Sequence, residues 1–167
     1  MTLKRIAPLA LTLLLMVLGT GCSLFSGNEK EQAMARGQAV LALTVEADQA
    51  YYRRDWDLAE RLYRQASEQD PGQAYLWFRL GNVLMYRTRL SEAREAYREA
   101  INRDQGFAKA WNNLATSHLL EAREALSYLY SNLQPGDPAQ SALATRLTLL
   151  DEVLEQAPAD IPSLSRQ

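Results

Sequence analysis

The chain has 167 residues, of which 47% are hydrophobic and 23% charged, and this composition is that of one ordinary globular domain with a buried core. Its formal net charge of −2 gives no electrostatic reason to expect a nucleic-acid partner. A single cysteine, a single histidine and the lack of a glycine-rich phosphate loop leave no common metal, nucleophile or nucleotide site. We therefore expect no metal, no cofactor and no enzymatic activity.

Residues 1–21 are typical of a signal peptide. Lys4 and Arg5 precede the apolar run LALTLLLMVLG, which is too short to span a bilayer comfortably. The small residues Gly19, Thr20 and Gly21 then precede Cys22, and this context resembles the lipobox of bacterial lipoproteins. The resemblance implies that Cys22 carries the acyl chains of a membrane anchor. The alternative is an ordinary secretory signal that is cut nearby and leaves an unpaired thiol.

Residues 22–35 are expected to form a flexible tether between this anchor and the folded part, because SLFSGNEKEQ is polar and contains glycine. Ser23 stands where many lipoproteins that stay in the inner membrane have aspartate. By resemblance to these sorting rules we expect the outer membrane of a Gram-negative host, with the protein facing the periplasm.

Residues 36–157 are expected to be all-α, because Ala, Leu, Glu, Arg and Gln recur at helical spacing without an alternating strand pattern. When the sequence is shifted against itself by 34 residues, many positions coincide. The coinciding pairs are Ala59 and Ala93, Tyr63 and Tyr97, Ala66 and Ala100, Asp70 and Asp104, Ala74 and Ala108, Trp77 and Trp111, and Leu80 and Leu114. Their spacing is that of packing positions in repeated helix pairs.

The turns repeat with the same period. Asp57 and Ser91 are expected to cap the start of the second helix of each pair, and Glu60 would complete a capping box with Asp57. These helices are expected to end at Asp70 and Asp104, where Pro or Gly follows.

The segment AYLWFRLGNVLMYRTRLSEAREAYREAINRD resembles the tetratricopeptide repeat at its signature positions. These are Trp77, Leu80, Gly81, Ala93, Tyr97 and Ala100. The preceding repeat, residues 40–73, keeps the second-helix pattern but has Leu43, Glu46 and Ala47 where Trp, Leu and Gly are usual. The resemblance covers residues 40–120 and implies a short helical solenoid of about 2.5 to 3 repeats.

The third repeat departs from the pattern. Residues 121–125 duplicate residues 92–96 at an offset of 29 instead of 34, so the turn between the two helices is missing. We predict one long helix that ends near Gln134, before Pro135-Gly136-Asp137-Pro138. Its packed stripe would consist of Trp111, Ala115, His118, Ala122, Ala125 and Leu129.

A last amphipathic helix, with Leu143, Leu147, Leu150 and Leu154 on one side, is expected to cap the open end of the solenoid. Residues 158–167 are expected to form a disordered tail.

The family resemblance also implies a concave groove that binds a protein partner through the first helix of each pair. Its predicted residues are Tyr51, Tyr52, Tyr75, Phe78, Asn82, Met85, Lys109, Asn112, Asn113 and Thr116. Asn82 and Asn113 stand where some tetratricopeptide grooves hold a peptide backbone, so both are expected to be exposed. Phe78 stands where a clamp for a terminal carboxylate has lysine, so we expect no such clamp. Alternatively, the aromatic residues pack on the protein's own helices and the partner binds the convex face.

A lipoprotein of this plan resembles the pilotins of type IV pili and secretion systems. The resemblance implies an adaptor or assembly factor that binds proteins and could form a homo-oligomer. An adaptor for peptidoglycan hydrolases or envelope proteases is an alternative. A hydrolase that uses Asp55 and Asp57 as an acid pair is a remote alternative, because both residues fit a turn.

Overall fold

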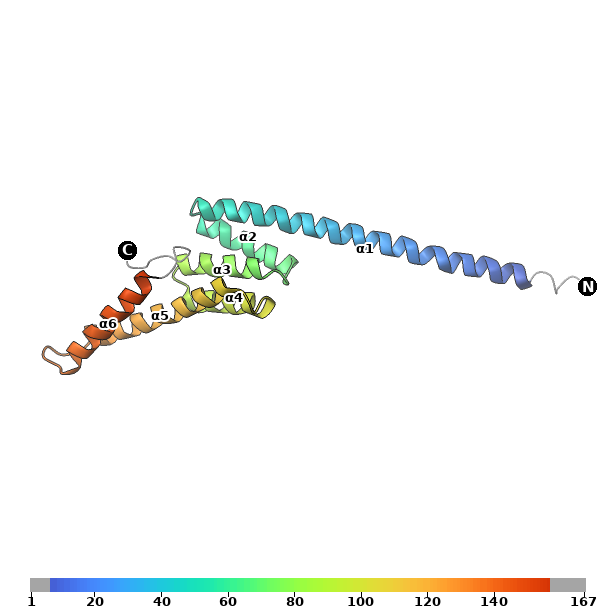
Figure 1. The fold of residues 1–167 in the computed structure, drawn as a ribbon. Helices are drawn as coiled ribbons and strands as arrows, with labels where there is room; N and C mark the ends of the chain where they lie inside the picture. The colour runs from blue at the N-terminus through green and yellow to red at the C-terminus, as the bar shows by residue number, and fades with distance from the viewer. Residues whose placement is uncertain (1–6, 157–167) are drawn as a thin grey trace, which may run out of the picture. The chain divides into compact units, whose positions relative to one another are not determined.

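The computed structural model describes the backbone of residues 7–156 and the side chains of residues 28–156. This part is built from six α-helices without a strand, so the all-α prediction is confirmed. The helices are α1 (Ala7–Tyr52), α2 (Trp56–Gln69), α3 (Ala74–Tyr86), α4 (Leu90–Arg103), α5 (Ala108–Ser131) and α6 (Ala139–Glu155). The chain divides into two compact units, Met1–Leu41 and Ala42–Gln167. The second unit contains the end of α1 and all the other helices (Figure 1).

The first unit differs from the expectation of a flexible tether, because α1 runs without a break through residues 22–35. Good helix formers at residues 29–36 outnumber the breakers in this stretch, and Gln32 donates a 3.0 Å hydrogen bond to Asn28 one turn earlier. The signal peptide and the lipid on Cys22 stay predictions, and residues 158–167 lie outside the described part. No helix of the described part is long and apolar enough to cross a membrane.

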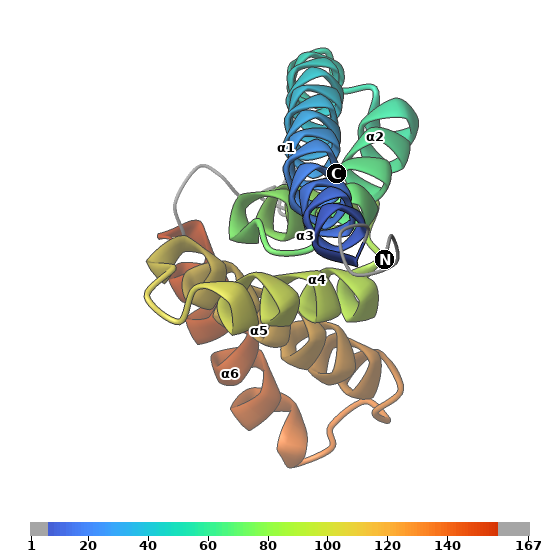
Figure 2. The same ribbon diagram turned by 90° about the vertical axis from the view of Figure 1, so that its right-hand side faces the viewer.

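The second unit is a stack in which each helix from α3 to α6 packs on the one before it (Figure 2). Ala59, Tyr63 and Ala66 of α2 are fully buried, and so are Ala93, Tyr97 and Ala100 of α4, 34 residues later. The predicted repeat therefore has a structural counterpart in the core. A Cβ atom on Gly81 would lie 2.5 Å from the Tyr97 ring, so the glycine is what allows α3 and α4 to approach this closely.

The ends of the second helices are confirmed, since α2 stops before Asp70 and α4 stops before Asp104. Their predicted starts are wrong. Asp55, not Asp57, caps α2 by accepting a 3.2 Å bond from the Leu58 amide, and Ser91 lies inside the first turn of α4. Arg54 and Thr88, 34 residues apart, both adopt a left-handed φ of about +60°. This conformation ends the preceding helix abruptly, so each second helix begins earlier than predicted.

The long third-repeat helix is confirmed as α5, with 24 residues. Its predicted packed stripe is wrong, because Trp111 is 51% exposed and Leu129 48% exposed. The buried residues lie on another side of the helix; they are Ala110, Asn113, Leu114, Thr116, Ser117 and Leu120.

The C-terminal helix α6 packs on α5 as predicted. Leu143 is buried, and Leu147, Leu150 and Leu154 are half-buried, so the predicted leucine face is the face in contact. An ion pair also joins Arg123 of α5 to Asp151 of α6.

Candidate functional site

The residues predicted to line the groove divide into two groups. Tyr52, Tyr75, Lys109 and Asn112 are exposed, and Tyr51 is half-buried. The other five are buried; they are Phe78, Asn82, Met85, Asn113 and Thr116. The expectation that Asn82 and Asn113 are exposed is therefore wrong.

The two asparagines form a buried hydrogen-bonded junction between three helices. Asn82 Oδ1 of α3 accepts a 2.9 Å bond from the Tyr97 hydroxyl of α4 and a 2.8 Å bond from Asn113 Nδ2 of α5. Burial raises the pKa of Tyr97, so its hydroxyl stays a proton donor. Because the Asn82 oxygen already accepts two bonds, it is engaged in holding the helices together.

A second junction surrounds Arg79 and connects the end of α1 to α2 and α3. Arg79 Nε donates to Asp48 Oδ1 at 3.1 Å and to the Tyr63 hydroxyl at 2.9 Å. The Tyr75 hydroxyl donates to the same carboxylate at 3.1 Å, and the Arg79 guanidinium lies 3.8 Å from the centre of the Tyr51 ring. Burial raises the pKa of Tyr75 to about 12. Tyr51 and Tyr75 therefore contribute to the protein's own packing.

Four of the predicted groove residues are exposed: Tyr52, Tyr75, Lys109 and Asn112. We call them the first-helix face, because all four lie on α1, α3 or α5, the first helices of the pairs. Two of the four residues contact the junctions. Asn112 Nδ2 donates to Asn113 Oδ1 at 3.4 Å, and the Tyr75 hydroxyl donates to Asp48.

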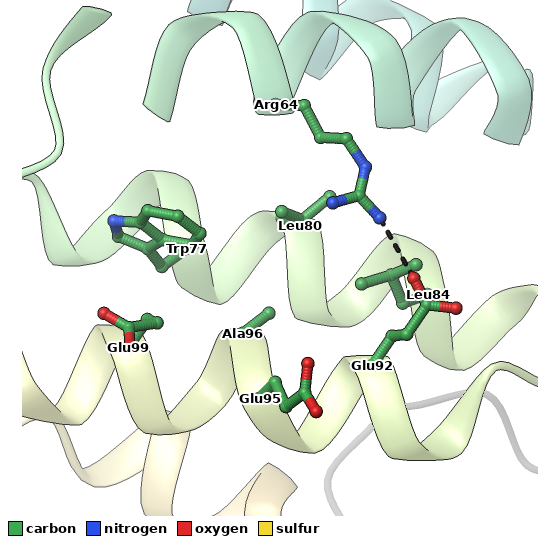
Figure 3. Close-up of a pocket in the computed structure, with 8 residues that line it drawn as sticks. All are labelled: Arg64, Trp77, Leu80, Leu84, Glu92, Glu95, Ala96 and Glu99. Carbon is green, nitrogen blue, oxygen red and sulfur yellow. Dashed lines mark hydrogen bonds and ion pairs between the residues drawn. The ribbon is translucent and has the colours of Figure 1, made fainter. Parts of the chain in front are cut away.

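A pocket lies on the side of α3 that is opposite Phe78 and Asn82 (Figure 3). Successive residues of a helix are rotated by about 100°, so the side chains of Trp77, Leu80 and Leu84 point to this opposite side. Its volume is about 300 Å³. Leu80, Leu84, Ala96 and Trp77 form the apolar part of its lining, and Arg64, Glu92, Glu95 and Glu99 form the polar part. Sequence reasoning missed this site. The signal was present as three glutamates at three- and four-residue spacing on one face of α4.

Ion pairs close one end of this pocket and connect α2 to α4. Glu60 of α2 binds Arg64 at 2.8 Å, Arg89 at 2.8 Å and Arg87 at 2.9 Å, and Arg64 also binds Glu92 of α4 at 3.3 Å. Burial raises the pKa of Glu60, but the hydrogen bonds from Arg64 and Arg89 outweigh burial and lower it overall. At the other end, Arg103 and Trp77 both donate to the Pro71 carbonyl, at 2.9 and 3.0 Å.

The two carboxylates considered as a catalytic pair have structural partners. Asp55 caps α2, and Asp57 forms an ion pair with Arg87. Within residues 28–156, no group of three or more His, Cys, Asp or Glu side chains is placed to hold a metal ion.

The helix pairs, their 34-residue period and their shared core positions define a helical-repeat protein. The sequence model described as "Tetratricopeptide repeat" matches residues 44–106 and 78–138, so the chain belongs to the tetratricopeptide repeat family. No curated protein matches it in sequence. As a tetratricopeptide protein, the chain has the fold of a scaffold for protein–protein interactions.

Solved structures of low sequence identity share this fold, each with a TM-score of 0.50. The Arabidopsis OM64 TPR domain is 17% identical, over 68% of this chain and 98% of its own. The TPR2B domain of yeast Sti1, in a pHsp70 complex, is 18% identical over 70% and 98%. The second TPR domain of human RPAP3, in complex with an HSP70 peptide, is 18% identical over 69% and 97%.

Proposed function

We propose that this chain is a lipid-anchored adaptor of the bacterial envelope that holds a partner protein during assembly of a pilus or secretion machine. The observation that carries the proposal is the first-helix face, where exposed phenol, amine and amide groups are mounted on a rigid frame. A partner segment would bind there without first ordering the side chains behind it, which lowers the entropic cost of association.

The frame consists of the two junctions, of which the one at Asn82 is buried and the one at Arg79 is partly buried. The bond between Asn113 and Asn82 fixes α5 against α3, and the ion pair between Arg79 and Asp48 fixes α3 against the end of α1. Tyr75 and Asn112 are then held on adjacent first helices. Asn112 offers both a donor and an acceptor to a peptide backbone, and Tyr75 offers an aromatic surface.

The Sti1 and RPAP3 domains are in complex with Hsp70 segments, which supports peptide binding as the mode for this fold. The partner of this chain is expected to differ. Phe78 is buried, and the centre of its ring lies 5.0 Å from the centre of the Phe107 ring. This position therefore offers no cation to a terminal carboxylate. We therefore propose that an internal segment of the partner is bound.

The anchor and the location rest on the sequence alone. Cys22 follows an apolar run and small residues, and two or three acyl chains would hold the protein at a membrane stably. Ser23 supports the outer membrane, with the helical repeats in the periplasm. Replacing Cys22 with Ser should move the protein from the membrane fraction to the soluble periplasmic fraction. If the variant stays in the membrane fraction like the parent chain, the proposed lipid anchor is contradicted.

The partner can be identified by photo-cross-linking in cells, with a photoreactive amino acid at Tyr75 or at Asn112. We expect both positions to capture one envelope protein, and a secretin or pilus subunit would support the proposed role. Capture of a hydrolase or protease would favour the alternative adaptor. A matched probe at Glu95, an exposed pocket residue, separates the two surfaces, since capture at Glu95 alone would place the partner in the pocket and contradict the first-helix face.

A further inference from the structure

One side of α5 carries a row of six exposed residues, which we call the α5 seam. They are Trp111, Ala115, His118, Ala122, Ala125 and Leu129. Their spacings alternate between four and three residues, which is the a/d pattern of a helix that packs on another helix along its whole length. At 1.5 Å per residue the seam is about 27 Å long.

The preceding repeat shows what such a face normally contacts. The residues 34 positions before the start of the seam are Trp77, Gly81 and Leu84 of α3. Leu84 is 1% exposed, and Gly81 lies against the Tyr97 ring of α4. The third repeat lacks the turn that would return a second helix to this face, and α6 packs on α5 through a different side. The seam is therefore a helix-binding surface without a helix.

The positions of the seam are arranged symmetrically about position 120. They form three pairs whose two members are equally distant from Leu120; the pairs are 111 and 129, 115 and 125, and 118 and 122. A second α5 in antiparallel orientation would therefore place Trp111 opposite Leu129, Ala115 opposite Ala125, and His118 opposite Ala122. Large side chains would close the two ends, and alanines would allow the helix backbones to approach closely in the middle.

Size and charge also fit this pairing. Ala115 has the Cβ that Gly81 lacks, so a tyrosine seated like Tyr97 would clash with it, whereas the alanine of a second copy would not. Glu121 would lie near the two-fold axis, two residues along the helix from the position opposite its own copy. Arg94 Nη2 binds Glu121 Oε1 at 3.0 Å, which offsets the repulsion between the two carboxylates.

From this geometry we propose that the α5 seam binds a second copy of this chain, as an antiparallel and symmetric helix pair. The interface is isologous, because each contact occurs twice across the axis. A single helix pair of this length is smaller than a standard protein interface, so the dimer is reversible. The dimer leaves the first-helix face open, so each copy can bind its own partner segment.

Photo-cross-linking of the full chain in cells tests the pairing, with the reactive residue at Trp111 or at Leu129. We expect an adduct of two copies, in which the probe at 111 is joined to the region of Leu129 and the probe at 129 to the region of Trp111. A probe at Tyr52, an exposed aromatic outside α5, should give no adduct with α5 of a second copy. Adducts that join 111 to 111, adducts with other proteins only, or no adducts at all would overturn the proposal.

A pair of substitutions makes the test independent of the probe. Ala125→Glu puts a charged side chain opposite Ala115 and should lower the yield of the two-copy adduct about tenfold or more, the effect of roughly 1.4 kcal/mol. Ala144→Glu makes the same change at an exposed position of α6 and should leave the yield unchanged. Circular dichroism of both variants should match that of the parent chain, because both alanines are exposed. An unchanged yield for Ala125→Glu would overturn the proposal.

Discussion

Asn113 donates a 2.8 Å hydrogen bond from Nδ2 to Oδ1 of Asn82, and the two side chains are only 2% and 1% exposed. This bond crosses from α5 to α3, and the Tyr97 hydroxyl of α4 donates to the same oxygen. Three of the helices thus meet at one amide oxygen. The residues that resemble a peptide-binding pair in the sequence hold the repeats together.

Replacing Asn82 with Ala should lower the free energy of unfolding by about 1 to 3 kcal/mol, because two buried donors lose their acceptor. Urea unfolding followed by circular dichroism would measure this change. Asn112→Ala is the matched control, since Asn112 is exposed and its loss should change the stability by no more than about 0.5 kcal/mol. Equal stability of the Asn82 variant and the parent chain would contradict the structural role.

Replacing Gly81 with Ala should also destabilise the protein, by about 1 to 3 kcal/mol, because the added Cβ would lie 2.5 Å from the buried Tyr97 ring. Gly37→Ala provides the comparison, since a Cβ there has no neighbour within 4 Å. This exchange should leave the stability unchanged or raise it slightly, as alanine favours helix. A thermal melt of both variants would distinguish them, and a tolerated Gly81→Ala would mean that α3 and α4 can separate at little cost.

The pH dependence of stability should reveal the ion pairs of Glu60. The folded pKa of Glu60 is lowered, so this carboxylate stabilises the fold above its unfolded pKa of about 4.3. As the pH falls from there through the lowered folded pKa, the unfolded state takes up the proton first and this contribution is lost. Urea unfolding between about pH 6 and pH 3 should show the loss, and Glu60→Gln should make that part of the profile flatter. Identical profiles would show that these ion pairs contribute nothing.

The contribution of the Arg79 junction can be measured by a double-mutant cycle with Asp48→Asn and Arg79→Met. We expect a coupling energy of about 1 to 3 kcal/mol, since the two residues touch and both are largely shielded from water. Arg61, which lies exposed on α2, is a suitable control in a cycle with Asp48 and should give a coupling near zero. A coupling near zero for Asp48 and Arg79 would remove this junction from the rigid frame.

The core and most helix ends follow from the sequence, because alanines and tyrosines 34 residues apart mark packing positions, and Pro71 and Gly106 follow the helix ends. The helix starts do not follow from it. Arg54 and Thr88 adopt the left-handed conformation, and neither is the glycine or asparagine that usually signals it.

The site was harder to predict, because helical spacing defines the faces of a helix but not which neighbour covers each face. Asn82 faces α4 and α5, and Asn113 faces α3, so both are buried although they occupy predicted groove positions. The α5 seam shows the reverse error. It has the spacing of a packed stripe, but the missing turn leaves it without a second helix, so Trp111 is exposed.

A pair of asparagine substitutions can show whether the first-helix face holds the partner protein. Asn112→Arg puts a large charged side chain on this face, whereas Asn102→Arg makes the same change at an exposed position of α4. The binding of both full-length variants would be measured against the protein captured at Tyr75. We expect Asn112→Arg to weaken binding about tenfold or more at an unchanged melting temperature, and Asn102→Arg to bind like the parent chain. Equal binding by all three proteins would contradict this role of the first-helix face.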